Sequence, residues 1–276
     1  MSIRNANRCH CWNLSAAAFM ASVLGTALAG SALSGCGDRL DVGSDLLWTA
    51  RHELGDLSEW TALPGGGTEA VAPSSVEISP THVHQGRFGA KLTITAPANA
   101  GQQGAVLGRA GGLPRETYYS AWYYLPQPVA VGDNGFWVIM KFRIRNVPDN
   151  PDTARELYDL DLWTLPGGKM SLRLYDHRLG GYNVALDVAD PLVPTQRWFQ
   201  VEAFYRNAQD STGRVTYWLD GTKIVDIEGM AMAPNSWVGW QAGSVGKNLV
   251  PATAVLYVDD AAISRTRVTP TGIIAR

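Results

Sequence analysis

The stretch "VTYWLDGTKIVDIEG", residues 215–229, alternates apolar and polar side chains on both sides of Asp220-Gly221. Such alternation over several residues is typical of a strand with one buried face. An Asp-Gly pair favours the tight turn between antiparallel strands, because both turn residues take a positive φ. The stretch therefore predicts a β-hairpin, with strands at 215–219 and 223–228.

The same alternation recurs along most of the chain after residue 45, in short runs rich in Val, Ile, Tyr and Trp. Gly- and Pro-rich clusters separate the runs, and none of the runs predicts an amphipathic helix. The other predicted strands are 46–52, 76–78, 90–95, 118–125, 136–145, 157–163, 170–177, 184–188, 198–206, 237–241 and 254–264. Many short strands with closely spaced turns are typical of an all-β sandwich or barrel.

The first residues of the chain are of a different kind. They hold two arginines, a mainly apolar stretch and no acidic residue before "LSGC" at 33–36. This layout predicts a secretory signal, and its ending resembles the lipobox of bacterial lipoproteins, in which the cysteine carries a lipid. The resemblance implies a signal peptide at 1–35, a lipidated Cys36 with a tether over 36–45, and one domain at 46–276.

Two alternatives to a lipoprotein are a plain signal peptide and a membrane helix, although glycines and serines in the apolar run disfavour a stable span. Gly37 follows the cysteine, where an Asp would retain such a lipoprotein at the inner membrane. We therefore expect an extracytoplasmic protein of the cell envelope, held by lipid alone at the outer membrane or the cell surface.

Composition narrows the chemistry of the remaining chain. Arg4 and Arg8 lie in the signal, so 21 of the 23 cations stand against all 25 anions, a net charge of -4. This mild acidity offers no basic surface for a nucleic acid, and we expect none as a partner. All three cysteines, Cys9, Cys11 and Cys36, belong to the signal or the anchor. Neither a disulfide nor thiol chemistry is expected.

Stretches near both ends of the domain resemble a known superfamily. They are "ARHELGDLSEWTAL" (50–63), "HVHQGRFGAKLTI" (82–94), the hairpin stretch 215–229 and "AVLYVDDAAIS" (254–264). Together they resemble the opening and closing strands of concanavalin A-like and carbohydrate-binding jelly rolls. The resemblance implies a two-sheet antiparallel jelly-roll β-sandwich with a polysaccharide as its partner. Because that superfamily holds lectins, hydrolases and polysaccharide lyases, the resemblance is specific for fold and not for activity.

A row of cations marks the strand "GFWVIMKFRIRN", residues 135–146. They stand at alternate positions: Lys141, Arg143 and Arg145. In a two-sheet sandwich one face of this strand fills the core and the other faces outward. Strict alternation assigns Trp137 to the cationic face and the even-numbered residues to the core.

Neighbouring predicted strands also carry polar and aromatic residues at alternate positions. On "LYDLDLW", "MSLRLYDHR" and "RWFQVEAFYRN" these are Asp159, Asp161, Trp163, Arg173, Tyr175, His177, Gln200 and Glu202. If the strands share a sheet, these side chains join the cations on one face. Aromatic faces stack on sugar rings and charged forks bind hydroxyls or carboxylates, so this face predicts a substrate-binding polysaccharide groove.

Arg173, Tyr175 and His177 occupy one face of a single predicted strand, with Cα atoms spanning about 13 Å. Elimination at a uronate needs a cation for the carboxylate, a base for the adjacent proton and an acid for the leaving oxygen. Arginine suits the first role, and tyrosine and histidine suit the others. The trio is similar to those of polysaccharide lyases with this fold, so we expect these residues to be catalytic.

Three alternatives remain open. The stretch "LYDLDLW" resembles the Glu-x-Asp-x-Glu strand of laminarinase-like hydrolases, with Leu157 at the nucleophile position. A hydrolase would then use Asp159 and Asp161 with Glu202. A monomeric binding module without turnover needs only the abundant tryptophans. The third alternative is a solvated face, on which Arg143 pairs with an aspartate of the next strand.

No cofactor is expected beyond a structural metal. In jelly rolls of this type a calcium ion often joins the first and last strands, which implies Glu53 and Asp260 as ligands. Backbone oxygens near Gly86 and Lys91 would complete the shell, and oxygen ligands suit a hard cation. The alternative is that Asp260 ends a strand in water.

Overall fold

The computed structural model describes residues 45–60, 67–182, 184 and 186–273. The hairpin forms as predicted, from β12 (Gly213–Leu219) and β13 (Thr222–Met230). Asp220 and Gly221, between the strands, have φ angles of 47° and 80°. Both lie in the left-handed region that a tight hairpin turn requires, which explains the Asp-Gly pair.

The hairpin forms one edge of an eight-stranded antiparallel sheet. Its hydrogen-bonded order is β13-β12-β11-β6-β15-β4-β3, and β1 also pairs with β15. Its further strands are β1 (Leu46–Ala50), β3 (Ser75–Ser79), β4 (Gly89–Thr95), β6 (Glu116–Tyr124), β11 (Trp198–Arg206) and β15 (Thr253–Ser264). Because β6 lies between β11 and β15, neighbours in space are distant in sequence, as in a jelly roll and not in a meander.

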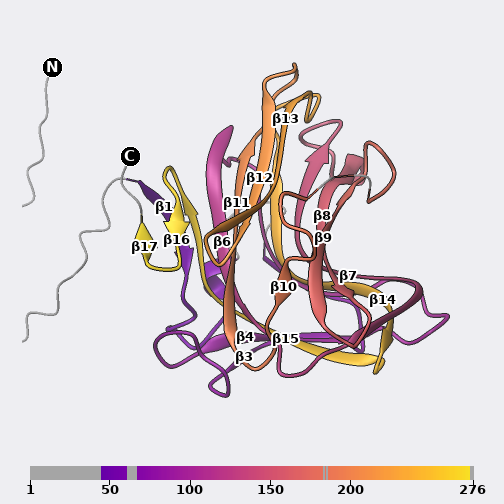
Figure 1. Ribbon diagram of the computed structural model, residues 1–276. Coiled ribbons are helices and arrows are strands. Elements are labelled where there is room, and N and C mark those ends of the chain that lie inside the picture. The colour runs from indigo at the N-terminus through magenta and orange to yellow at the C-terminus, as the bar shows by residue number, and fades with distance from the viewer. Residues whose placement is uncertain (1–44, 61–66, 183, 185, 274–276) are drawn as a thin grey trace, which may run out of the picture. The chain divides into compact units, whose positions relative to one another are not determined.

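A seven-stranded antiparallel sheet, in the order β10-β9-β8-β7-β14-β5-β2, packs against it (Figure 1). Its strands are β2 (Gly67–Ala70), β5 (Gln103–Ala110), β7 (Ala130–Arg145), β8 (Ala154–Thr164), β9 (Met170–Asp176), β10 (Leu192–Val193) and β14 (Gly239–Val250). The small elements are η1 (Ser58–Trp60), η2 (Pro151–Thr153), β16 (Val268–Thr269) and β17 (Gly272–Ile273). The predicted two-sheet jelly-roll sandwich is confirmed.

Aromatic side chains fill the space between the two sheets. Phe142 of β7 stacks on Tyr205 of β11 with ring centroids 4.5 Å apart. The Tyr123 hydroxyl of β6 donates a hydrogen bond of 3.1 Å to the carbonyl of Ile139 in β7. All four residues are buried. Because burying such a side chain contributes roughly 1.5–3 kcal/mol, these interlayer contacts hold the sheets together.

A β-bulge in β7 changes the predicted facing of its first half. Val138 of β7 is opposite Asp161 of β8, and Met140 is opposite the next residue of β8, Leu160. Ile139 is therefore an extra residue in β7 that has no partner opposite it in β8. One extra residue shifts the side-chain alternation by one position. The predicted outward facing of Trp137 is therefore wrong: its side chain is fully buried, and its Nε1 donates to Ser244 Oγ at 2.7 Å.

A second bulge lies at Leu157 in β8. Phe142 of β7 is opposite Tyr158, so continuous pairing would place Leu157 opposite Arg143. Glu156 is opposite Arg143 instead. Leu157 turns into the core, where it is 2% exposed. The outward face of β8 consequently carries Glu156 together with Asp159 and Asp161, where strict alternation had predicted Leu157.

The strand β5 was not predicted from the sequence. Gly104 and Gly108 interrupt its alternation of apolar and polar residues, and glycines are typical of turns. Its neighbour β14 needs a glycine for close approach, since a Cβ on Gly243 would lie 2.7 Å from Val106 Cα.

The predicted strand at 184–188 is wrong for its described residues, which lie in no strand. The nearest strand is instead the two-residue β10.

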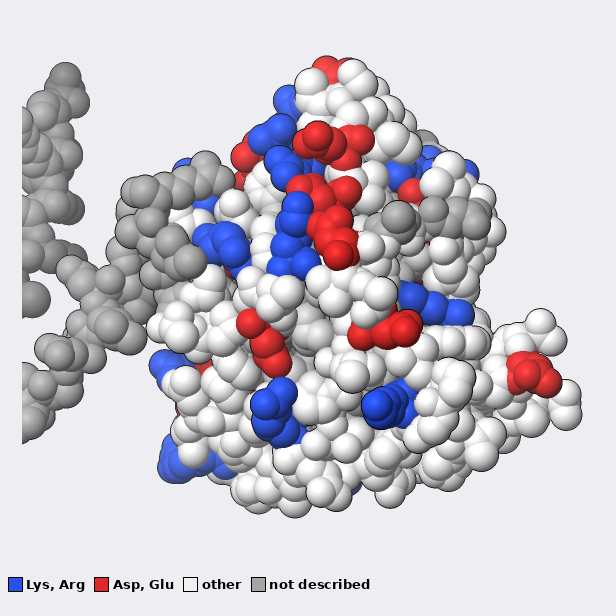
Figure 2. Space-filling model, in the orientation of Figure 1, with Lys and Arg blue, Asp and Glu red and all other residues white. Residues whose placement is uncertain are grey.

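Charged side chains of both signs interleave where β12 and β13 lie on the face shown in Figure 2. Ion pairs make up this pattern: Arg214 lies 2.6 Å from Asp226, and Lys223 lies 3.3 Å from Asp187. Since these two cations each have an anion beside them, the charges over β12 and β13 do not form a patch of a single sign.

The predicted signal peptide, Cys36 and residues 36–44 of the tether lie outside the described residues. All the described residues belong to one structural unit. Within the part of the chain that the structure describes, no helix is long and apolar enough to cross a membrane. The lipid anchor and the envelope location stay predictions.

Candidate functional site

The outward faces of β7, β8 and β9 meet around a pocket of about 270 Å³. Five of the lining residues were selected from the sequence: Lys141, Asp159, Asp161, Tyr175 and His177. They come together because Lys141 is opposite Asp159 in the sheet and Asp159 is opposite Tyr175. We refer to this space as the groove pocket; its further lining is Gln102, Phe136, Val138, Glu156, Tyr182 and Val245.

His177 and Asp159 are hydrogen-bonded in the groove pocket, with Nε2 and Oδ2 2.9 Å apart. A carboxylate oxygen only accepts, so we infer that Nε2 carries the hydrogen and that Nδ1 of the neutral ring keeps its lone pair. Burial by itself lowers the pKa of His177, but the hydrogen bond and charge of Asp159 and the charge of Glu156 outweigh it, and the pKa is raised. The imidazole is therefore oriented and suited to proton transfer near neutral pH.

Tyr175 lies beside this imidazole. Its ring makes edge contacts with His177 and Tyr182, at centroid distances of 4.7 and 4.9 Å. Two contacts of this kind restrict the ring on both sides. A phenol and an imidazole, which are both able to exchange protons with a substrate, thus share one pocket.

Two carboxylate oxygens in the groove pocket lack a donor. Asp159 Oδ1 and Asp161 Oδ1 are buried and have no hydrogen-bond partner among the described residues. A buried acceptor without a donor costs about 1–3 kcal/mol. Hydroxyl groups of a sugar are donors that could satisfy both oxygens.

Tyr182, from the segment after β9, covers one side of the pocket. Its hydroxyl donates to Asp161 Oδ2, and its ring centroid lies 3.5 Å from the Arg173 guanidinium carbon. Trp163 lies against the same guanidinium at 3.4 Å. The predicted trio is therefore divided: Tyr175 and His177 line the pocket, whereas Arg173 packs against two aromatic rings.

Asp161 is only 1% exposed. Burial raises its pKa to about 7 and the nearby Asp159 adds to the rise, while the Tyr182 hydrogen bond and the charges of Arg173 and His177 oppose it. The group is therefore partly protonated at neutral pH.

We expect Asp161→Asn to flatten the pH dependence of stability between about pH 4 and pH 8. The folded state binds the proton of the Asp161 carboxyl group more tightly than the unfolded chain does. The stability that this proton contributes is therefore complete below pH 3.8, the ordinary pKa of the group, and is lost as pH rises through about 7, its pKa in the folded protein. The wild type should lose up to about 4 kcal/mol from this group over that range. Urea unfolding at both ends measures the difference, and equal slopes for the two proteins would contradict the prediction.

The three cations share the outward face of β7, as predicted, but have different surroundings. Lys141 Nζ lies 3.5 Å and Arg143 Nε 3.8 Å from the same oxygen, Oε1 of Glu156. Arg145 instead stacks on Trp237, with 4.3 Å between its guanidinium carbon and the ring centroid. Only the first two lie beside the groove pocket.

A smaller cavity of about 140 Å³ continues from the groove pocket towards β5 and β2. It shares Gln102, Lys141, Glu156 and Val245 with the groove pocket. It adds polar side chains of Glu69, Gln103, Arg143 and Gln241. The two cavities together form a groove across several strands, which suits a ligand that is longer than one sugar.

Gln200 and Glu202 do not reach this groove, so their predicted placement is wrong. Both lie in β11, which belongs to the other sheet. Glu202 accepts hydrogen bonds from Arg267 Nε at 2.8 Å and from the Val268 backbone, and Gln200 donates to the Val268 carbonyl. The alternation predicted which residues share a face of β11 but not the sheet to which β11 belongs. Because Glu202 lies in the other sheet, a hydrolase that uses Glu202 together with Asp159 and Asp161 is excluded.

The two predicted calcium ligands are held by protein donors. Glu53 Oε1 accepts from the backbone of Arg87 at 2.8 Å, and Asp260 Oδ2 lies 2.6 Å from His84 Nδ1. Asp260 also lies 3.3 Å from Arg51 Nε. Both carboxylates thus have protein partners in this structure. Calcium stays a prediction from the resemblance.

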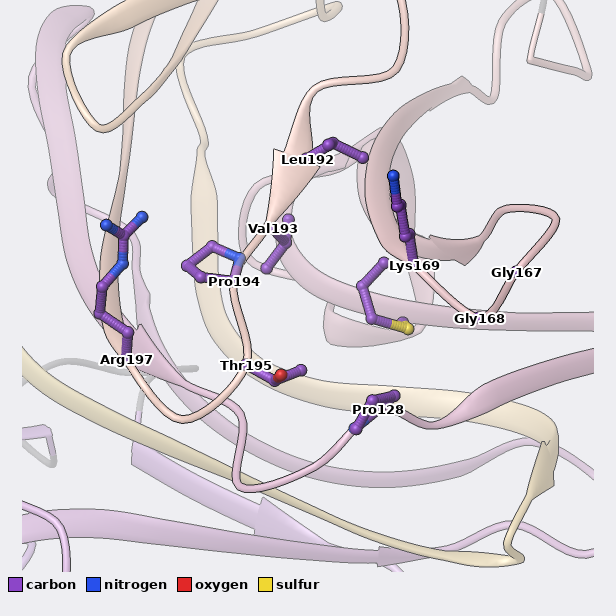
Figure 3. Close-up of a pocket in the computed structure, with 10 residues that line it drawn as sticks. Pro128, Gly167, Gly168, Lys169, Leu192, Val193, Pro194, Thr195 and Arg197 are labelled. Carbon is purple, nitrogen blue, oxygen red and sulfur yellow. The ribbon is translucent and has the colours of Figure 1, made fainter.

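A separate pocket of about 450 Å³ lies where the segment around β10 approaches the turn between β8 and β9 (Figure 3). Lys169 and Arg197 stand on different sides of it, and Leu192, Val193 and Pro194 supply apolar surface. The described residues that line it include no carboxylate, histidine or tyrosine. It therefore lacks the proton-transfer groups of the groove pocket.

One important residue, Tyr182, could not be recognised in the sequence. It follows Gly180-Gly181 and looked like part of a turn, although an aromatic residue in such a turn is itself a signal of a packed loop. The outward facing of Glu156 on β8 depends on the bulge at Leu157, and no local pattern reveals that bulge.

Comparisons with known proteins place the fold. No protein-family model and no curated protein matches the sequence. Among solved structures, the endo-β-1,4-glucuronan lyase from the fungus Trichoderma reesei matches with a TM-score of 0.56 and 15% identity, covering 80% of this chain and 96% of that one. The chain has a concanavalin A-like jelly-roll fold.

Two further structures show the same likeness. The catalytic domain of the glycoside hydrolase family 131 protein from Coprinopsis cinerea has a TM-score of 0.53, 13% identity and coverage of 84% and 98%. The marine PL-14 alginate lyase from Aplysia kurodai has a TM-score of 0.51, 9% identity and coverage of 79% and 98%. At such identities the likeness shows fold and not activity.

Proposed function

We propose that this protein binds an acidic, uronate-containing polysaccharide in the groove and cleaves it by β-elimination. The observation that carries the proposal is the placement of Tyr175 and His177 in one pocket with the cation Lys141. Glucuronan and alginate lyases with this fold support a uronate as the substrate.

The geometry suggests a role for each side chain. Lys141 and Arg143 neutralise the uronate carboxylate and thereby acidify the proton on the adjacent C5 carbon. His177 takes that proton on Nδ1 while Asp159 holds the ring through Nε2. The Tyr175 hydroxyl gives its proton to the leaving glycosidic oxygen as the bond from C4 to that oxygen breaks. The electron pair from C5 forms the C4–C5 double bond of the product.

The test mixes the purified protein with alginate, glucuronan, pectate, a heparinoid and neutral glucans. Two signals are followed together: the ultraviolet absorbance of unsaturated uronates and the release of reducing ends. Absorbance that rises on an acidic chain supports the lyase. Silence in both signals, with retention on a polysaccharide column, would instead identify a binding protein without turnover.

Hydrolysis is the second candidate, and the row of carboxylates on β8 favours it. Glu156, Asp159 and Asp161 share the outward face, and the raised pKa of Asp161, about 7, suits a general acid. The fold likeness to the family 131 glycoside hydrolase domain adds support. Reducing ends without ultraviolet absorbance, lost in Asp161→Asn, would favour this candidate over the lyase.

We also infer a lipid-anchored, extracytoplasmic location, which rests on the sequence before Cys36. Replacing Cys36 with Ser is expected to move the protein from the membrane fraction to the soluble fraction, because the lipid has no other acceptor thiol in "LSGC". Detergent fractionation with an immunoblot measures this change. Equal distribution of variant and wild type would contradict the anchor.

A further inference from the structure

Glu156 contacts both cations of the groove through one oxygen. Its Oε1 lies 3.5 Å from Lys141 Nζ and 3.8 Å from Arg143 Nε. Burial alone would raise the pKa of Glu156. The charges of Lys141 and Arg143 and a backbone hydrogen bond lower the pKa by more than burial raises it, so the net shift is downward. Glu156 is thus a carboxylate between two cations in the free protein.

These contacts leave the cations incompletely satisfied. Both distances exceed the 2.7–2.9 Å or so that a strong charge-assisted hydrogen bond has. Arg143 Nε is buried and has no hydrogen-bond partner among the described residues. The Lys141 side chain is only 7% exposed, so little water can solvate its charge. A better-placed carboxylate would therefore gain from both cations.

The position of Glu156 depends on the bulge in β8. Continuous pairing would place Leu157 opposite Arg143, whereas the bulge places Glu156 there. The Glu156 side chain is 32% exposed, so it can move into solvent without unfolding the strand. The bulge thus presents a movable carboxylate to the two cations.

We propose that Glu156 occupies the substrate-carboxylate subsite of the free protein and that a uronate displaces it on binding. This inference rests on the proposed function and names the determinant of its specificity. A uronate brings a replacement carboxylate for Lys141 and Arg143, whereas a neutral sugar does not. Neutral chains therefore leave Glu156 in place, and the exchange selects acidic ones.

The test compares Glu156→Gln with the wild type by titration calorimetry on oligomers of glucuronan and of alginate, and on a neutral glucan. The glutamine keeps the shape and removes the competing charge, so we expect uronate binding to tighten about tenfold. The gain should be larger at low salt, because partly exposed charges are screened. Affinity for the neutral glucan should not change.

Two further variants separate the explanations. Glu156→Asp retains a competing charge and should show a smaller gain than glutamine. Glu228→Gln removes an exposed charge on β13, where the carboxylate lies 3.8 Å from Arg214 Nη1, and should leave uronate affinity unchanged. An equal gain in both glutamine variants would mean a general charge effect and would overturn the proposal.

The possible failures can be told apart. If the wild type binds or cleaves a polyuronate but Glu156→Gln binds it no more tightly, the displacement is wrong and the proposed function stands. If neither protein binds any polyuronate, both the function and the displacement are wrong. Loss of hydrolysis in Glu156→Gln at unchanged affinity would make Glu156 catalytic and would also overturn its role as a displaced carboxylate.

Discussion

Replacing Tyr175 with Phe is expected to lower the rate of uronate elimination about 10²- to 10⁴-fold, the range for loss of a general acid or base. The phenyl ring keeps the edge contacts with His177 and Tyr182, so the pocket should keep its shape. Only the proton for the leaving oxygen is lost. The rise of ultraviolet absorbance on the preferred polyuronate measures the rate, with affinity measured separately.

The matched control is Tyr257→Phe, which removes a hydroxyl from a tyrosine of β15 in the other sheet. Its activity should equal that of the wild type. His177→Ala should be as inactive as Tyr175→Phe, because the two act in the same step. If Tyr175→Phe keeps full activity while His177→Ala has none, a different group must protonate the leaving oxygen.

Replacing Trp137 with Ala is expected to destabilise the fold by about 3–5 kcal/mol, as large-to-small changes of buried tryptophans do. The side chain is fully buried, and its loss also removes the donor to Ser244 Oγ. The unfolding free energy from urea titration measures the effect. Trp137→Phe gives a milder loss that remains measurable if the alanine variant does not fold.

Trp163→Ala is the control for this prediction, because Trp163 is only partly buried and packs against Arg173. It should cost less stability than Trp137→Ala. The opposite result, a stable Trp137→Ala that has lost binding, would show that Trp137 faces the groove and that the bulge at Ile139 is absent.

Much of the fold could be predicted from local chemistry. Alternation and the Asp220-Gly221 turn predicted the hairpin of β12 and β13, and similar patterns predicted most long strands. The strand β5 escaped because Gly104 and Gly108 interrupt its alternation, although both glycines pair with residues of β14. Such pairing depends on a strand that is distant in sequence, so a local pattern cannot reveal it.

The site shows the same division. The sequence by itself determined which side chains alternate on one strand face, and so it brought Tyr175 and His177 together and placed Lys141 with Arg143. Those placements hold because the two-residue period of a strand is a local property.

Tertiary structure alone decided which strands share a sheet and where the alternation slips. It assigned Gln200 to the other sheet, buried Trp137 through one bulge and exposed Glu156 through another. Strand neighbours and bulges depend on pairing between residues far apart in the chain, and a one-residue slip exchanges the two faces of a strand. The sequence therefore determined the residue types available to the groove, and long-range pairing decided which of them line it.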